Sequence, residues 1–103
     1  MKGFQLTFST LQSRKHPNGE HLSHWLIGFS KKLGIQGVTV IKASQGVGRD
    51  GTLHSDTFFE LADEPLEVVM NVSEELCEDL FKALSQEKLE LFYTKTPIEF
   101  GTI

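Results

Sequence analysis

The sequence LEVVMNVSEELCEDLFKALS, residues 66–85, joins a strand to a helix with no loop between them. Apolar side chains occupy every second position at its start: Leu66, Val68, Met70 and Val72. This alternation predicts a strand with one buried face. TFFELA, just upstream, also has strand character, so we expect one long strand over 57–72. A break is expected near Pro65, because proline cannot donate to a β-ladder.

The helix of this pair is predicted over 74–86. Ser73 is a favourable N-cap residue, and Glu74 and Glu75 follow it at the positive end of the helix dipole. Apolar residues then recur at helical spacing: Leu76, Cys77, Leu80, Phe81 and Leu84. Because Cys77 lies on this stripe, we interpret it as a buried structural thiol.

The N-terminal half repeats the same order of elements. FQLTFS, residues 4–9, alternates strictly, which predicts a half-buried strand. SRKHPNGE, residues 13–20, contains several helix and strand breakers and is predicted to be a loop. A helix is predicted over 20–33 from its apolar stripe, and Gly34 follows where a helix commonly ends in a left-handed glycine.

Two further strands complete the pattern. GVTVIKAS, residues 37–44, is rich in β-branched residues, and LELFYTK, residues 89–95, alternates up to a predicted end at Thr96-Pro97. IEFGTI, residues 98–103, is too apolar for a free tail and is expected to pair with something. The order β-α-β-β-α-β with a C-terminal extension predicts an α+β, ferredoxin-like sandwich.

In that fold both helices cover one face of an antiparallel four-stranded sheet, and we expect residues 1–103 to form a single domain of this kind. The other face would carry a mixture of apolar and neutral polar residues: Gln5, Thr7, Thr39, Val69 and Phe92. An exposed apolar patch usually marks an interface. The sequence therefore predicts an oligomer with this second face inside the assembly.

Composition excludes several classes of protein. The 103 residues carry 10 Lys+Arg against 14 Asp+Glu, a net charge of −4, which does not suit binding to nucleic acid. No apolar run is long enough for a membrane span, and the N-terminus lacks the apolar core of a signal peptide. The single cysteine allows no internal disulfide, so we expect a soluble protein of the cytoplasm.

Residues 46–51, GVGRDG, have the form G-x-G-x-x-G. In dinucleotide-binding proteins that pattern opens a helix, but residues 52–54 lead to another strand, which argues against a Rossmann-type site. Two interpretations stay open: a β–β connection with glycines at positive φ, or a loop that binds an anion through backbone N–H groups and Arg49. The residues expected to bind such a ligand are Gly46, Gly48, Arg49, Gly51, His54 and Arg14.

His16, His21 and His24 lie close together around the start of the first predicted helix. They could share a metal ion, or they could be solvated residues of the helix start, and no metal ligand is assigned. Arg14, Lys15 and His16 form a small basic cluster, which we expect at the opposite end of the subunit from the glycine-rich connection.

No nucleophile stands in a catalytic pattern. Asp63 and Glu64 flank a proline turn and are expected to be solvated charges. No Ser-His-Asp arrangement has supporting context. We therefore expect that the protein is not an enzyme. An acylphosphatase-type activity, which would use a loop with arginine after the first strand, is the enzymatic alternative.

The segment GVGRDGTLHS, residues 46–55, resembles the domain-of-unknown-function 190 family, which belongs to the PII-like (nitrogen-regulatory-protein-like) signalling proteins. Its pattern G-x-G-x-x-G-x-x-H-S/T is matched by Gly46, Gly48, Gly51, His54 and Ser55. A preceding G-x-T-V strand is matched by Gly37, Thr39 and Val40. MKGFQLTF, FFELADEPLEVVM and LFYTKTPIEFG also look like this family, so the resemblance extends over nearly the whole chain.

This resemblance implies a compact homotrimer in which the sheets line the centre. It also implies that residues 46–56 form a loop like the T-loop of PII proteins, which bind adenine nucleotides between subunits near the base of that loop. GVGRD is similar to their GFGRQ segment, with Asp50 in place of the glutamine.

The resemblance thus favours a trimeric signalling or regulatory protein. It would bind a small anionic metabolite at subunit interfaces, with an adenine nucleotide as one candidate, and no other cofactor is implied. Loop 46–56 would contact an unidentified target protein, a membrane protein among the options. The alternative is a divalent-metal-binding trimer like the cation-tolerance family, in which the three neighbouring histidines would load metal.

Overall fold

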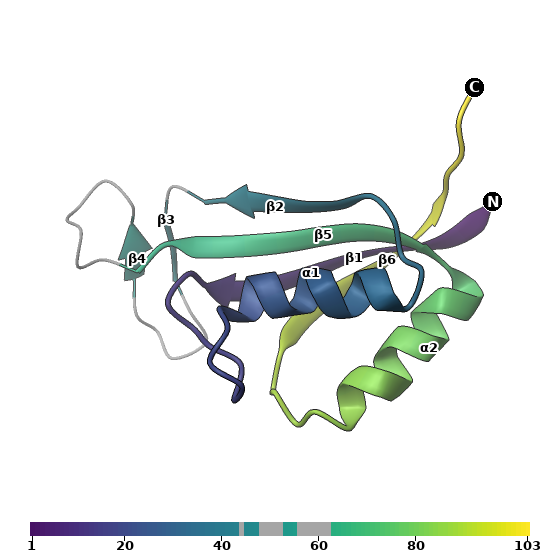
Figure 1. Ribbon diagram of the computed structural model, residues 1–103. Coiled ribbons are helices and arrows are strands. Elements are labelled where there is room, and N and C mark those ends of the chain that lie inside the picture. Colours follow the sequence, from purple (N-terminus) through teal and green to yellow (C-terminus); the bar gives the residue numbers. More distant parts are fainter. Residues whose placement is uncertain (44, 48–52, 56–62) are drawn as a thin grey trace.

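The computed structural model describes residues 1–43, 45–47, 53–55 and 63–103. Its elements are β1 (Lys2–Leu11), α1 (Leu22–Lys32), β2 (Val38–Lys42), β3 (Gln45–Val47), β4 (Leu53–Ser55), β5 (Pro65–Ser73), α2 (Glu74–Ser85) and β6 (Phe92–Glu99). Four strands form one antiparallel sheet in the order β2-β5-β1-β6, while β3 and β4 pair separately. Both helices lie on the same face of the main sheet (Figure 1). The predicted α+β, ferredoxin-like arrangement is confirmed.

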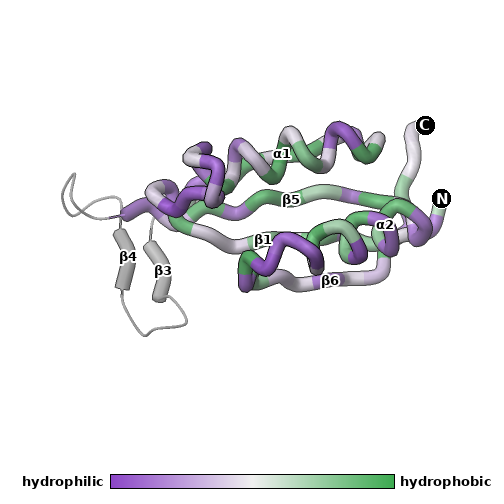
Figure 2. The backbone as a smooth tube through the Cα atoms, turned by 60° about the horizontal axis from the view of Figure 1, so that its bottom comes forward, coloured by the Kyte–Doolittle hydropathy of each residue, from purple (hydrophilic) through white to green (hydrophobic). Residues whose placement is uncertain are grey.

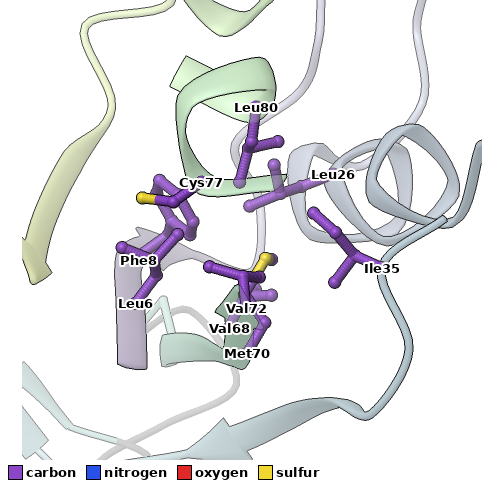
Figure 3. Packing of buried hydrophobic residues seen from close by; sticks show 9 residues of the cluster. All are labelled: Leu6, Phe8, Leu26, Ile35, Val68, Met70, Val72, Cys77 and Leu80. Carbon is purple, nitrogen blue, oxygen red and sulfur yellow. The ribbon is translucent and has the colours of Figure 1, made fainter. Parts of the chain in front are cut away.

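The core lies between this sheet and its two helices. The predicted apolar faces of β1, α1, β5 and α2 contribute to it (Figure 3), and the cluster of buried side chains is Leu6, Phe8, Leu26, Ile35, Val68, Met70, Val72, Cys77 and Leu80. Burial raises the pKa of the Cys77 thiol, which therefore stays protonated at neutral pH. Cys77 is buried as predicted, and its environment does not favour a nucleophilic thiolate.

Hydrogen bonds confirm the predicted start of α2 and the predicted end of α1, whereas α1 begins at Leu22 and not at Glu20. The Ser73 hydroxyl accepts from the N–H of Leu76 at 3.1 Å, which caps α2. At the end of α1, Gly34 adopts φ +92°, and its N–H donates to the Lys31 carbonyl. The N–H of Ile35 donates to the Ser30 carbonyl in the same turn, so α1 ends in a Schellman motif that buries Ile35. Neither helix is long and apolar enough to cross a membrane.

The predicted break near Pro65 is confirmed, because β5 begins at that residue, and the predicted strand residues 57–62 lie outside the described residues. The predicted bounds of the last strand were wrong. β6 spans Phe92–Glu99 instead of 89–95 and continues through Pro97. Proline is tolerated there because β6 is an edge strand, where a missing N–H can face away from the neighbouring strand.

The predicted pairing of the C-terminal residues is confirmed as far as Phe100. Ile98 and Glu99 belong to β6 and pair with the start of β1. Phe100 and Met1 exchange two backbone hydrogen bonds of 2.8 and 2.9 Å, one of them from the terminal ammonium group. Residues 101–103 have no regular structure and extend away from the sheet (Figure 1).

The second face of the main sheet is not covered by either helix. The strand register places the predicted residues on it, since they alternate with the buried ones: Gln5, Thr7, Thr39, Val69 and Phe92. In Figure 2, α1 and α2 both lie on the same side of β1, β5 and β6. The predicted placement of these five residues is therefore confirmed, while the oligomer inferred from them stays a prediction.

Candidate functional site

Three connections meet at one end of the main sheet. β1 and β2 are both antiparallel neighbours of β5, so they run in the same direction and terminate at the same end of the sheet. β5 and β6 start at that end. The β1–α1 loop, the connection that holds β3 and β4, and the α2–β6 loop therefore share this end, opposite the two termini (Figure 1).

This geometry corrects the prediction that the Arg14 loop lies at the opposite end from the glycine-rich connection. The reason is topological. A helix that crosses back between two strands returns the chain to the end of the sheet where the first strand began. The second strand then runs parallel to the first and terminates at the same end. The hydrogen bond from the Gln12 N–H to the Glu64 carbonyl, 2.9 Å long, joins the two segments directly.

The base of the connection is fixed by polar contacts with the β1–α1 loop. Asp63 accepts hydrogen bonds from both the N–H and the hydroxyl of Ser13. Glu64 pairs with the Lys42 ammonium group at 3.3 Å. Asp63 and Glu64 are thus half-buried and bonded, and the prediction that both are solvated charges was wrong. The local sequence Asp63-Glu64-Pro65 could not predict these contacts, because both partners are distant in the chain. Ser13 lies fifty positions before Asp63, and Lys42 lies on a neighbouring strand.

Arg14 reaches the third connection. Its guanidinium donates a hydrogen bond to the carbonyl of Leu89 in the α2–β6 loop. A guanidinium has five N–H donors, so this bond uses only part of its capacity. Arg14 was predicted to bind a ligand, and the structure places it at the same end of the sheet as Gly46 and His54, the other two predicted residues that it describes.

The α2–β6 loop contains two residues with positive φ that its sequence does not predict. Lys88 and Glu90, on either side of Leu89, adopt φ +54° and +51°. Left-handed backbone is unfavourable for residues with a Cβ and accumulates at functional sites. Without a glycine or asparagine at these positions, sequence reasoning had no signal for this part of the candidate site.

Replacing Lys88 with glycine is expected to raise the free energy of unfolding by about 0.5–1 kcal/mol, because glycine adopts positive φ without steric cost. Urea titrations at a fixed protein concentration would measure this change. Lys82→Gly, in the last turn of α2, removes the same charge and should lower stability by about 0.5–1 kcal/mol. A loss of stability in Lys88→Gly would contradict the argument.

The three neighbouring histidines are not brought together as one ligand set. The Nδ1 atom of His16 accepts from the Asn18 N–H at 3.0 Å, so Nε2 carries the proton and donates to Glu87 at 3.0 Å. The His16 ring also stacks on Trp25, with centroids 4.2 Å apart. His21 Nδ1 lies 2.9 Å from the Gln12 carbonyl oxygen, and His24 is exposed. Within the described residues, no group of three metal-ligating side chains is assembled.

The glycine-rich segment is described only in part. β3 and β4 pair antiparallel, and Gly46 lies opposite His54 in their register. The structure thus brings these two predicted residues together through the backbone. A strand, not a helix, follows residue 52, which agrees with the exclusion of a Rossmann-type site. Gly48, Arg49 and Gly51 lie outside the described residues.

Comparison with known proteins places this geometry in a family. The family model DUF190, described as Uncharacterized ACR, COG1993, matches residues 5–99. No curated protein sequence matches the chain.

Solved structures with the same fold are PII-like proteins. CPII from Thiomonas intermedia, a nitrogen regulatory PII-like protein bound to ADP, AMP and bicarbonate, superimposes with a TM-score of 0.73 at 16% identity, covering 99% of this chain and 91% of CPII. A PII-like signalling protein from Thermus thermophilus gives a TM-score of 0.68 at 17% identity, covering 95% of this chain and 88% of its own.

The match over residues 5–99 takes in the main sheet, both helices and the three connections at the shared end. The likeness to solved structures confirms a PII-like, ferredoxin-like fold. The chain therefore belongs to the DUF190 family.

Proposed function

We propose that this chain is a PII-like regulatory protein that binds a small anionic ligand at the shared end of the sheet, with an adenine nucleotide as the first candidate. The observation that carries the proposal is the meeting of the Gly46–His54 pair, the Arg14 loop and the strained α2–β6 loop at that end. CPII, which has the same fold, is bound to ADP, AMP and bicarbonate, and this supports the choice of ligand.

In this proposal the backbone N–H groups of Gly46, Gly48 and Gly51 and the guanidinium of Arg49 contact the anion. Asp50 would repel a phosphate group unless a cation lies between them, so Mg²⁺ is part of the test. A ligand that prefers the ordered form of loop 46–56 shifts the population toward that form. The ordered loop then contacts a target protein.

The proposed assembly is a cytoplasmic homotrimer with the uncovered sheet faces inside. Thr7, Thr39, Val69 and Thr94 form one row across this face, and none of them is charged. This row places no charges between identical copies, and burying Val69 removes apolar surface from water. Glu67 lies in the neighbouring row of the same face, so the assembly must leave that carboxylate in contact with water or with a cation. We expect ligand binding without turnover. The metal-binding alternative has little support, because both ring nitrogens of His16 already have protein partners.

A thermal-shift titration tests the proposal directly. The ligands are ATP, ADP, AMP, cyclic AMP, pyrophosphate and bicarbonate, with and without Mg²⁺, against wild type and Arg49→Ala. A ligand at a hundredfold excess over its Kd stabilises the native state by about 2.7 kcal/mol, which raises the Tm by several degrees. Loss of a charge-assisted hydrogen bond should weaken binding in Arg49→Ala by about tenfold or more.

The matched control is Lys31→Ala, which removes one positive charge near the C-terminal end of α1, at the other end of the sheet. It should bind the ligand as the wild type does. If the ligand raises the Tm of Arg49→Ala as much as that of the wild type, the binding site does not include Arg49 and the assignment to the glycine-rich segment is wrong. No shift with any of the ligands would overturn nucleotide or bicarbonate binding.

A further inference from the structure

The β1–α1 loop holds the α2–β6 loop at two neighbouring points. The guanidinium of Arg14 donates to the carbonyl of Leu89, and Nε2 of His16 donates to the carboxylate of Glu87 at 3.0 Å. Lys88 lies between the two held residues and has a left-handed backbone with φ +54°. Because such a backbone persists only where its surroundings fix it, the two contacts hold this loop in a conformation that it would not keep alone.

His16 is itself fixed on several sides. Its side chain is 12% exposed, and its ring lies nearly parallel to that of Trp25 on α1, with 4.2 Å between the centroids. Nδ1 accepts from the Asn18 N–H at 3.0 Å, and the backbone N–H of His16 donates to the carbonyl of Glu20. These contacts give the ring one orientation, and in that orientation Nε2 faces Glu87.

The stack continues into the body of the protein. Trp25 stacks on Phe29, one turn further along α1, with centroids 4.7 Å apart, and both residues pack against the core. His16 therefore connects the α2–β6 loop to a helix whose position the core determines. The carbonyl of Leu89 follows Glu87 by two residues, so this connection also fixes the place where Arg14 finds its partner.

We propose that His16 is a positioning residue for the anionic ligand of the proposed function. It holds the α2–β6 loop through Glu87, and that loop in turn holds the guanidinium of Arg14 through the carbonyl of Leu89. The guanidinium donors that Leu89 does not use stay available to an anion. The inference rests on the proposed function and adds a residue that acts on the ligand through Arg14.

Holding Arg14 in advance favours ligand binding. An arginine side chain loses much of its rotamer freedom when a ligand immobilises it, and this loss weakens binding. In this chain the bond to Leu89 restricts Arg14 already before the ligand arrives. Release of the α2–β6 loop would leave Arg14 free in the unbound protein, which should weaken binding of an anion about three- to tenfold.

Two substitutions of His16 separate its two side-chain hydrogen bonds. The amide nitrogen of glutamine reaches the place of Nε2, so His16→Gln keeps a donor for Glu87 and loses the acceptor for Asn18. The shorter side chain of asparagine reaches only the place of Nδ1, so His16→Asn keeps the acceptor and loses the donor. Both variants lose the stack on Trp25. The proposal predicts weaker binding in His16→Asn than in His16→Gln, and a dominant role of Asn18 predicts the reverse order.

Substitution of Glu87 removes the same hydrogen bond from the other partner and leaves the stacked ring in place. Glu87→Ala also removes a negative charge, which by electrostatics alone should strengthen the binding of an anion. The positioning role predicts weaker binding, so the sign of the change separates the two effects. Glu87→Gln loses the same charge but keeps an acceptor oxygen for His16, and it should bind at least as tightly as the wild type.

Two measurements on these variants test the proposal. Calorimetric titration with ADP in the presence of Mg²⁺ gives the Kd, and ¹⁵N relaxation of the Arg14 Nε–H group in the ligand-free protein gives its order parameter. In His16→Asn and Glu87→Ala we expect a Kd about three- to tenfold higher and a lower order parameter of Arg14. His24→Asn, the same change at an exposed histidine of α1, is the matched control and should behave as the wild type.

The outcomes separate this inference from the proposed function. An order parameter of Arg14 that equals the wild-type value in both His16→Asn and Glu87→Ala overturns the positioning role. A mobile Arg14 with an unchanged Kd for ADP also overturns it and leaves the proposed function intact. If ADP does not bind to the wild type, the proposed nucleotide ligand is wrong, and the role of His16 in binding it is wrong as well.

Discussion

Replacing Phe8 with alanine is expected to lower the free energy of unfolding by about 3–5 kcal/mol, the usual cost of removing a buried phenyl ring. Phe8 is 1% exposed at the centre of the core. Its ring centroid lies 6.2 Å from that of Phe81 on α2 and 6.4 Å from that of Tyr93 on β6. The cavity would thus open between the sheet and α2, where the surrounding side chains come from three elements and cannot all move inward.

Urea unfolding at a single protomer concentration would measure this loss, since the stability of an oligomer depends on concentration. Phe8→Leu is the matched control. It keeps most of the apolar volume and should cost no more than about 1.5 kcal/mol. A loss in Phe8→Ala as small as that of Phe8→Leu would mean that the ring is not the centre of the packing described above.

Gly3→Ala is expected to cost about 1–3 kcal/mol, the usual range for forcing extra atoms into a packed site. A methyl group on Gly3 would overlap the carbonyl oxygen of Val72 in β5 and meet the ring of Phe100 at 2.9 Å. The ring of Phe100 could turn aside. The Val72 carbonyl belongs to the backbone of the neighbouring strand, so relief there requires shifting the β1–β5 pairing.

Gly28→Ala provides the opposite case in the same protein. Gly28 lies within α1, and a methyl group there would have no neighbour within 4 Å. Alanine should therefore raise the free energy of unfolding by about 0.5–1 kcal/mol through helix propensity alone. Calorimetry on both variants would show a lower Tm for Gly3→Ala and a higher Tm for Gly28→Ala. Equal shifts would show that the close approach of Val72 to Gly3 does not constrain the strand.

Much of the fold could be predicted from local sequence signals. The alternation over 66–72, the cap at Ser73 and the turn at Gly34 each depend on residues within a few positions of one another. Periodicity and capping report on such short distances, which is why the order of elements and the buried faces were correct.

The errors came where distant segments meet. Thr96-Pro97 predicts the end of a strand, but the place of Pro97 on an edge strand allows the pairing to continue. The proline turn predicts a solvated Asp63, but Ser13, fifty positions earlier, donates two hydrogen bonds to its carboxylate. The left-handed backbone at Lys88 and Glu90 could not be predicted from the sequence, because neither residue type favours positive φ.

The order of the main-sheet strands and of the two helices, and most of the side chains that form the core, could be predicted from the sequence alone. The pairing of β3 with β4 and the place of Arg14 at the same end of the sheet as that pair became apparent only in the folded chain. The physical reason is that hydrophobic pattern and capping act over a few residues, whereas strand direction and register are set by pairing between segments far apart in the chain.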